Sequence, residues 1–179
     1  KKNMNNFILY NQILSIKPFE KIYINKKFIS FLNNPKVNKY LNVRHKKQTI
    51  LSAKKYFFLT QEKKIIYCGI FDSKKSNIVG TVTLRKITNK KCYIGNMIGD
   101  TSYFGSKISK QSFNMFLCYI FDHLKYTEIH AGTEKNNISA NFNIITNGFK
   151  LSKKSKLYFF FKLKKNYLKF NTNYKIQYA

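Results

Sequence analysis

Three β-like runs in close succession constrain the fold of this chain most strongly. They are IIYCGIF, IVGTVTLRKI and CYIGNMI, and the short polar stretches SKKSN and TNKK separate them. Short loops of this kind join neighbouring strands as hairpins, so we predict an antiparallel meander between residues 65 and 98. The other segments must be arranged around that meander.

The segments before the meander predict one strand and two helices. Residues 13–19 are expected to form a first strand. Apolar residues then recur at helical spacing in KIYINKKFISFLNNPKVNKYL, until Pro35 interrupts the helix. A second helix is expected over residues 49–59, with Thr49 as a suitable N-cap residue.

A long helix over residues 106–124 should follow the meander, because its apolar residues form a broad stripe. A short strand over residues 128–133 and a helix near 137–146 come next, and Asn147-Gly148 is a good helix stop. KLYFFFKL is the last clear strand. The residues from Lys164 onward are weakly patterned and basic.

The predicted order is therefore strand, two helices, three strands, helix, strand, helix, strand. Runs of strands with helices over a mixed sheet indicate an α/β or α+β sandwich. The 179 residues are 44% apolar and 17% aromatic, which is ample for one core, and no Gly/Ser/Pro-rich linker divides them. We predict a single domain, residues 1–179, with a basic C-terminal tail over residues 165–179.

The formal charge of +27, from 34 basic and 7 acidic residues, would attract polyanions strongly. The basic residues are almost all lysine and are spread along the chain, and Asn, Ile, Tyr and Phe are abundant too. Codon bias in an A/T-rich genome produces the same mixture. The charge alone therefore does not predict a nucleic-acid partner, and a preference for anionic ligands is kept as an alternative.

Three cysteines, Cys68, Cys92 and Cys118, are widely separated within apolar runs, which argues against a disulfide framework and against a metal site. Polar residues interrupt the apolar stretch FILYNQILSI, which makes it a poor signal peptide. No run reaches the roughly 18 apolar residues of a membrane span. We therefore expect a cytoplasmic protein with no membrane span and no metal.

Three stretches carry a resemblance to a known family. They are LNNPKVNKYLNVR, IGNMIGDTSYFGSKISKQS and EIHAGTEKNNISANFNIITNGFKL, and together they span most of residues 13–163. In this order they resemble the motifs W-x-N-D-P-x-V-x-x-Y-L, I-G-x-x-I-x-x-x-x-W-G-K-G-x-G/A and I-x-A-x-x-x-x-N-x-x-S followed by G-F. These motifs belong to the GCN5-related N-acetyltransferase (GNAT) superfamily, in the branch of ribosomal-protein N-terminal and nucleotide-amino-sugar acetyltransferases.

The resemblance implies a mixed, mostly antiparallel sheet flanked by helices and splayed between its fourth and fifth strands. It also implies acetyl-coenzyme A (acetyl-CoA) as cofactor, with the pyrophosphate on the N-terminus of the long helix, where unpaired N–H groups and the positive dipole end meet. We call residues 105–110 the cofactor turn. By resemblance, the cofactor-binding residues are Asn96, Met97 and Ile98 with their strand backbone, Asn137, and the turn residues Gly105, Ser106, Lys107, Ile108, Ser109 and Lys110.

The cofactor turn departs from the family pattern Q/R-x-x-G-x-G/A, which falls on residues 104–109. Lys107 stands where the first motif glycine is expected, and Ser109 stands at the final small residue. Glycine suits that position because the backbone must approach phosphates without a Cβ in the way. Lys107 could point outward or add a charge to the phosphate, and Ser106 could cap the helix. A plain strand-to-helix turn is the alternative.

Direct acetyl transfer needs a neutral amine, a polarised carbonyl and a proton for the departing thiolate. Many superfamily members use a tyrosine on the last helix as the acid, but Ile144 stands at its position. Ser139 is the nearest candidate, although Ala140 could instead hold the family serine position. Ordinary helix capping is the alternative for Ser139 and for Asn137.

The proton acceptor has several candidates. Asp100 is near the cofactor turn, and His45 lies in the loop expected to border the acceptor, where a histidine can accept a proton near neutral pH. Asp72 and Glu134, at strand ends, and His130 on the later strand are further candidates, and His123 on the long helix is a lesser one.

The acceptor side is expected to include Asn42 and Arg44 as substrate-binding residues. Asn42 stands where relatives carry a glutamate. The guanidinium of Arg44 could hold a phosphate or carboxylate of the acceptor, and a surface ion pair is the alternative.

The favoured function is acetyl-CoA-dependent transfer of acetyl to a small primary amine, most of all a nucleotide-linked amino sugar of surface-polysaccharide synthesis. The basic surface suits such a diphosphate-bearing acceptor. A protein N-terminus, for instance of a ribosomal protein, is the second enzyme hypothesis. A nucleic-acid-binding or scaffold domain without cofactor is the third hypothesis. The assembly state is left open, with a homodimer as one alternative.

Overall fold

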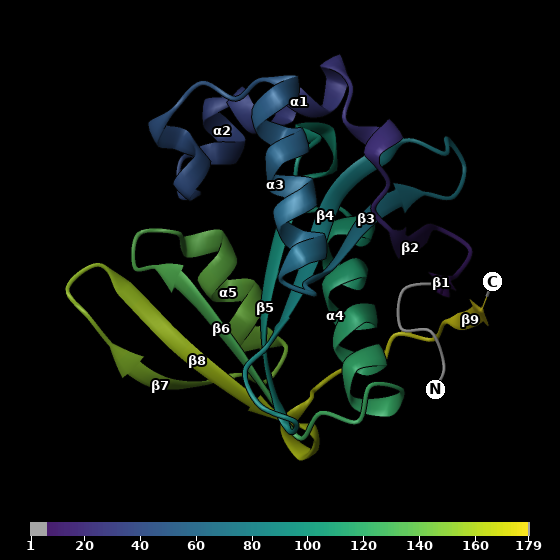
Figure 1. The fold of residues 1–179 in the computed structure, drawn as a ribbon. Helices are drawn as coiled ribbons and strands as arrows, with labels where there is room; N and C mark the ends of the chain where they lie inside the picture. Colours follow the sequence, from purple (N-terminus) through teal and green to yellow (C-terminus); the bar gives the residue numbers. More distant parts are fainter. Residues whose placement is uncertain (1–6, 179) are drawn as a thin grey trace.

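The structure is a computed structural model that describes residues 7–178, and nine strands in that part of the chain form one mixed sheet (Figure 1). The strand order is β7-β8-β6-β5-β4-β3-β2-β1-β9. The strands are β1 (Phe7–Tyr10), β2 (Leu14–Pro18), β3 (Ile66–Asp72), β4 (Ile78–Lys86), β5 (Lys91–Ile98), β6 (Glu128–Glu134), β7 (Lys150–Lys154), β8 (Tyr158–Lys164) and β9 (Lys175–Tyr178).

The predicted meander, β3 to β5, forms the middle of this sheet. Its strands pair antiparallel along nearly their whole length. All seven residues of β3 are buried, because helices cover both faces of the sheet at this point. The mixed, largely antiparallel sheet between helices confirms the predicted fold class.

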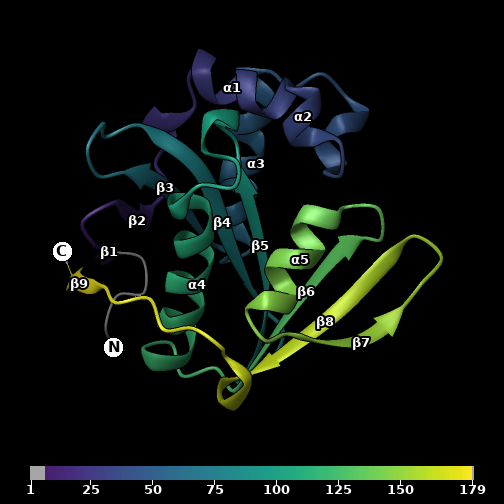
Figure 2. The ribbon, with the colours of Figure 1, turned by 180° about the vertical axis from the view of Figure 1, so that it is seen from behind.

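Five α-helices surround the sheet in the described part of the chain. They are α1 (Lys26–Asn33), α2 (Pro35–Asn38), α3 (Ile50–Glu62), α4 (Lys107–Asp122) and α5 (Ile138–Thr146). α4 and α5 lie on one face, which we call the α4 face, and α3 lies on the other, the α3 face (Figures 1 and 2). α1 and α2 lie at the end of the sheet where β5 finishes.

Local sequence explains where the helices begin. Thr49 caps α3 in a reciprocal capping box with Ser52. Pro35 ends α1 as predicted and, with Asn34 as N-cap, also starts the short α2. The stripe predicted on the long helix is present in α4 and packs on the sheet. Eleven of the sixteen residues of α4 are buried, because the C-terminal segment covers part of its other side.

Three strands were missed by the sequence prediction. β1 lies inside FILYNQILSI, and its interruption is a turn, since the Asn11 side chain accepts hydrogen bonds from the N–H groups of Ile13 and Leu14. β7 is fully exposed and reads KLSKK, with no apolar alternation to reveal it. Its lysines keep this edge of the sheet from pairing with another chain.

The third missed strand, β9, corrects the expectation of a weakly patterned tail. β9 pairs antiparallel with β1. The buried Asn114 of α4 holds the segment before it: its Nδ2 donates to the carbonyl oxygen of Phe170, and its Oδ1 accepts from the N–H and hydroxyl of Thr172 at 2.9 and 2.7 Å. The last segment therefore packs across α4 (Figure 2).

The sheet splits between β5 and β6, the fourth and fifth strands of the predicted order. These parallel strands pair at only three positions, Lys91 with Glu128, Cys92 with Ile129 and Tyr93 with His130. β5 stays paired with β4 and β6 with β8, while the two ribbons diverge (Figure 1). We call residues 93–98 the β5 wall and residues 128–134 the β6 wall of this split. The predicted splay is thus confirmed.

Candidate functional site

The β5 wall presents an unpaired strand edge beyond Tyr93. Asn96, Met97 and Ile98, predicted from the family resemblance, lie in this part, where pairing with β6 has ended. Ile94 belongs to the core under α4, so Asn96, two residues on, faces the same side. The Oδ1 atom of Asn96 is buried and has no hydrogen-bond partner in residues 7–178.

The cofactor turn exposes free backbone donors at the start of α4. Ser106 caps the helix, as the sequence suggested, because its hydroxyl accepts from the N–H of Ser109 at 3.2 Å. Gly105 has a φ of +69°, and a Cβ built there would meet nothing within 4 Å. Over the described residues, the N–H groups of Gly105, Lys107 and Ile108 have no hydrogen-bond partner. Three free donors at a positive dipole end suit an anion.

Tyr103 ties the cofactor turn to the meander. Its hydroxyl donates to Asp72 Oδ2 at 2.7 Å. This bond, with the N–H groups of Lys74 and Lys75, lowers the pKa of Asp72 although burial opposes the shift. Burial and the same bond raise the pKa of Tyr103 to about 12. The turn is therefore held by a charge-assisted hydrogen bond.

Asp100, a predicted proton acceptor, lies at the end of β5 and has local partners. Its carboxylate caps the 3₁₀ turn Thr101–Tyr103 by accepting from the N–H and hydroxyl of Ser102. Lys27 of α1 lies 3.8 Å from its other oxygen. The structure thus places Asp100 beside the cofactor turn, with its carboxylate engaged in holding local structure.

The β6 wall carries ionisable side chains on the α3 face. Ile129 and Ala131 point into the core under α4, so the alternate residues, Glu128, His130 and Glu134, face the other way. His130 Nε2 lies 2.8 Å from Glu128 Oε1. Burial raises the pKa of Glu128, but the contacts with His130 and Lys91 outweigh it, and the net pKa is lowered. Glu128 therefore stays anionic beside the histidine.

An ion pair joins the turn Asn42–His45, which is expected to border the acceptor, to the far end of the β6 wall. Arg44, in the 3₁₀ turn Asn42–His45, has its Nη2 2.7 Å from Glu134 Oε1. The angles do not make this contact a hydrogen bond, since Glu134 Oε1 has no such partner. Asn42 and His45 are exposed in the same turn. The ion-pair alternative for Arg44 is therefore the arrangement observed.

At the start of α5, the predicted asparagine and serine have different environments. Asn137 is the N-cap, with its Oδ1 accepting from the N–H of Ala140. Ser139 is exposed, and no hydrogen bond reaches its side chain in the described structure. Asn141, which sequence reasoning missed, is buried and donates to the carbonyls of Glu134 and Lys135, while its Oδ1 has no partner.

The α4 face of the split therefore fits a ligand with two kinds of group. Two unpartnered buried amide oxygens, on Asn96 and Asn141, call for N–H donors. Three free N–H groups at the cofactor turn call for an anion. Ile144, at the family's tyrosine position, is buried in the core and offers neither group.

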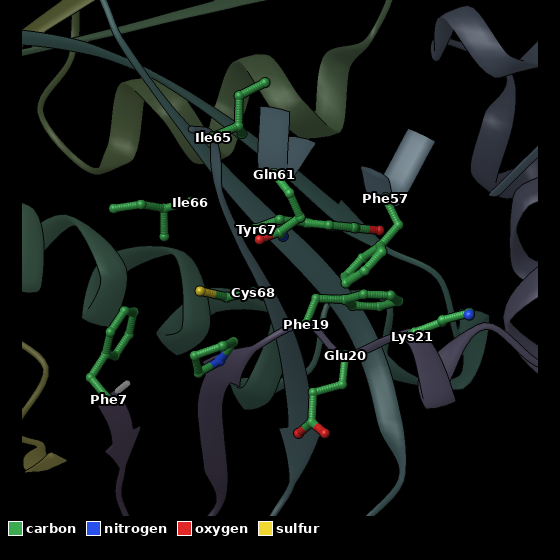
Figure 3. A pocket seen from close by; sticks show the side chains of 11 residues that line it. Phe7, Phe19, Glu20, Lys21, Phe57, Gln61, Ile65, Ile66, Tyr67 and Cys68 are labelled. Atoms are coloured by element: carbon green, nitrogen blue, oxygen red, sulfur yellow. The ribbon is translucent and has the colours of Figure 1, made fainter. Parts of the chain in front are cut away.

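One hollow of the described structure lies away from the split. It has a volume of about 340 Å³ and is lined by Phe19, Phe57 and Tyr67 of the α3 side, with Phe7 and Cys68 (Figure 3). It lies where β2 ends and β3 begins, and β4 separates these two strands from the β5 wall of the split. Its lining includes no residue of either wall or of the cofactor turn, so we place the functional site at the split.

Some residues of this site could be recognised from the sequence, and others could not. The turn Asn42–His45 and the β6 wall meet through Arg44 and Glu134, ninety positions apart, which no local pattern shows. Asp100 and the cofactor turn lie beyond the end of the other wall. The Glu128–His130 pair was readable in principle, because residues two apart on a strand share a face.

Comparison with known proteins gives a family and a fold. The model of the acetyltransferase (GNAT) domain family matches residues 15–150. No curated protein sequence matches the chain. Solved structures do, including Mycobacterium smegmatis RimJ in complex with CoA-disulfide, with 12% identity, a TM-score of 0.78 and coverage of 94% of this chain and 91% of that one.

Two further structures are similar at low identity. Apo FdhC, described as a nucleotide-linked sugar GNAT, has 18% identity, a TM-score of 0.74 and coverage of 90% of this chain and 92% of its own. The ribosomal-protein-S5-alanine acetyltransferase from Vibrio fischeri has 14% identity, a TM-score of 0.66 and coverage of 90% and 98%. At these identities the likeness shows a shared fold.

Proposed function

Because this chain belongs to the acetyltransferase (GNAT) domain family and is an N-acetyltransferase, we propose that its acceptor is a nucleotide-linked amino sugar. Members of the family use acetyl-CoA, which supplies an acetyl group activated as a thioester. Within the residues 7–178 no helix is long and apolar enough to span a membrane. The proposal concerns which residues hold the cofactor and which amine receives the acetyl group.

The cofactor would be held on the α4 face of the split. The free N–H groups of Gly105, Lys107 and Ile108 would receive its phosphates, with Ser106 and Ser109 holding the turn in shape. Its amide groups would find Asn96 Oδ1 and Asn141 Oδ1, together with the unpaired backbone of residues 96–98. The orphaned amide oxygens support this placement, because buried acceptors are normally satisfied.

The observation that carries the proposed acceptor is the charge of the helical cap. Residues 21–61, which include α1, α2 and all of α3 except its last residue, Glu62, contain ten basic residues and no acidic one. All seven carboxylates of the chain lie outside this segment. In the described structure, Asp100 and Glu134 lie close to only two of these ten residues, Lys27 and Arg44. The remaining positive charge of the cap favours an acceptor that brings its own negative charge, such as a diphosphate.

A panel of amines tests the proposal, with acetylated products detected by mass spectrometry. We expect a nucleoside-diphosphate-linked amino sugar to gain one acetyl group much faster than the same sugar without its nucleotide. The advantage should shrink as ionic strength rises, because salt screens exposed charges. Acetylation of N-terminal peptides with no reaction of any sugar would overturn it. A thermal shift with acetyl-CoA first verifies that the protein is competent to bind.

Matched lysine variants locate the effect. The double variant Lys46→Gln/Lys47→Gln, in the exposed loop after the Arg44 turn, should raise KM for the nucleotide sugar. The control Lys153→Gln/Lys154→Gln removes the same charge from β7, at the outer edge of the sheet, and should leave KM unchanged. Equal effects of the two variants would mean that net charge, rather than the cap, determines the preference.

A further inference from the structure

The closed end of the split brings three reactive side chains together on the α3 face. Tyr93 and His130 form the last residue pair before β5 and β6 diverge. Cys92 and Ile94 point into the core under α4, so Tyr93 faces the same side as His130. Glu128 lies two residues before His130 on that side. We call Tyr93, Glu128 and His130 the vertex cluster.

The vertex is where a cofactor arm along β5 would end. The free donors of the cofactor turn lie beyond Ile98, at the open end of the split. An arm that pairs with residues 94–98 therefore runs back toward Tyr93, and five strand residues span roughly 16 Å. It can go no farther, because the pairing of β5 with β6 closes the sheet there.

His130 is oriented as a proton acceptor. Its Nε2 lies 2.8 Å from Glu128 Oε1, and the Lys91 ammonium lies 3.3 Å from the same oxygen. A carboxylate at Nε2 favours the tautomer with its proton there, which leaves Nδ1 with a free lone pair. The other charged groups around this face are Arg85 of β4 and, on the paired strand β8, Lys162 and Lys164.

Tyr93 is placed as a proton donor. A Cβ built on Gly132 would lie 2.4 Å from the Tyr93 hydroxyl, so the phenol reaches across to β6 over the space that this glycine leaves. The Arg85 guanidinium lies 5.6 Å from the ring centroid. Burial raises the pKa of Tyr93 in spite of this cation. The hydroxyl therefore stays protonated at neutral pH.

We propose that His130, positioned by Glu128, accepts the proton of the acceptor amine and that the Tyr93 hydroxyl donates the proton to sulfur. The proposal rests on the acetyl-transfer function given above. As the N–C bond forms and the C–S bond breaks, the amine loses one proton to His130 Nδ1 and the sulfur gains one from Tyr93. Proton transfer from His130 to the phenolate then restores both side chains, so amine and thioester become amide and thiol.

A binding experiment tests the location without any turnover. The chain has three histidines, so their ring resonances can be followed individually by NMR. Adding coenzyme A to the wild-type protein should shift the ring signals of His130 and leave those of His123, at the C-terminal end of α4, unchanged. Saturation of the cofactor site with no change at His130 would overturn the proposal.

Variants test the roles. His130→Gln should lower kcat by about 100-fold or more, the range lost with a general base, while the Kd for coenzyme A measured by calorimetry stays within about twofold. His123→Gln is the matched control and should leave both values unchanged. Tyr93→Phe should lower kcat with the Kd retained. A His130→Gln enzyme that folds and keeps a kcat close to that of the wild type would contradict the proposal.

Glu128 acts through His130, so its test needs a different signature. Glu128→Gln should lower kcat and kcat/KM equally, with KM for both substrates unchanged, as expected for an interaction needed only in the transition state. A fall in thermal stability with kcat retained would instead mean a structural role. If the wild type acetylated no amine in the panel, the proposed function would fail, while the NMR experiment would still report whether His130 adjoins bound coenzyme A.

Discussion

The two walls of the split meet the same space with different chemistry. The β5 wall offers unpaired backbone and the neutral side chain of Asn96. The β6 wall offers Glu128, His130 and Glu134, all on its α3 face. The difference teaches that cofactor binding belongs to the β5 wall beyond Tyr93 and proton acceptance to the β6 wall, while the proposed proton donor Tyr93 lies where the two strands still pair.

The two walls also differ in how far neighbouring strands and helices bury them. The β5 wall continues the buried meander, and α4 covers it. The β6 wall belongs to an arm of β6, β8 and β7, whose outer strand is fully exposed. Changes in the β5 wall should therefore alter stability and cofactor affinity. Changes in the β6 wall should alter the acceptor and the chemistry.

The largest expected effect comes from crowding the β5 wall from behind. A Cβ at Gly80 of β4 would lie 2.1 Å from the carbonyl oxygen of Met97. The obstacle is backbone, so Gly80→Ala should lower the free energy of unfolding by roughly 3 kcal/mol, measured by urea titration. The control Gly105→Ala meets no neighbour and carries only the strain of its φ of +69°, about 1 kcal/mol. Equal losses would contradict the close approach of β4 and β5.

The second prediction is that removing an unpartnered amide oxygen changes stability and cofactor affinity in different ways. Asn96→Leu removes a buried acceptor that has no partner, so the unfolding free energy of the ligand-free protein should rise by about 1 kcal/mol. The Kd for coenzyme A, measured by calorimetry, should rise about tenfold. Asn141→Leu should weaken binding similarly but lower stability, because it also removes two donated hydrogen bonds. Retained affinity in both variants would argue against cofactor contact at these atoms.

The third effect is the pH dependence of the anchored turn. Asp72, with its lowered pKa, stabilises the fold above its unfolded pKa, and this contribution is lost as pH falls through the folded value. The raised pKa of Tyr103 also stabilises the fold. This stabilisation is complete below about pH 10, the unfolded pKa, and is lost as pH rises toward the folded pKa of about 12. Tyr103→Phe should cost about 1.5 kcal/mol at neutral pH and flatten both limbs of a plot of Tm against pH. Unchanged limbs would show that this bond does not hold the turn.

A smaller effect is expected on the β6 wall. Glu134→Gln breaks the ion pair with Arg44, whose partners are 28% and 18% exposed, so stability should change by less than about 1 kcal/mol. KM for the acceptor should change while the Kd for coenzyme A does not. Asp122→Asn breaks an exposed ion pair of equal length with Lys165, away from both walls, and serves as control. Weaker binding of coenzyme A by Glu134→Gln would contradict the assignment of cofactor binding to the β5 wall alone.

The smallest effect concerns Lys107 in the cofactor turn. If backbone N–H groups hold the phosphates, Lys107→Gly should keep or slightly improve the Kd for coenzyme A, at a stability cost of about 0.5–1 kcal/mol in the first turn of α4. Lys107→Ala removes the same charge without that backbone freedom. Marked weakening in both variants would show that the lysine side chain, rather than the backbone of the cofactor turn, binds the phosphates.

The features that could be predicted from the sequence are those with local physical causes. Thr49 and Ser106 cap the helices that they were expected to cap, and the three runs of the meander pair as hairpins. β7 escaped prediction because an edge strand needs no apolar alternation. The unpartnered oxygen of Asn141 depends on how α5 docks, which no motif encodes.

The pairing of β1 with β9 sets an order on the folding of the chain. Phe7 pairs with Tyr178, so this contact closes a loop that contains nearly the whole described chain. Closing long loops costs entropy, and contacts of high contact order form late. The meander needs only local hairpins. Both walls of the split can therefore assemble early on the growing polypeptide, while the outer edge of β1 stays unpaired until residues 175–178 have been synthesised.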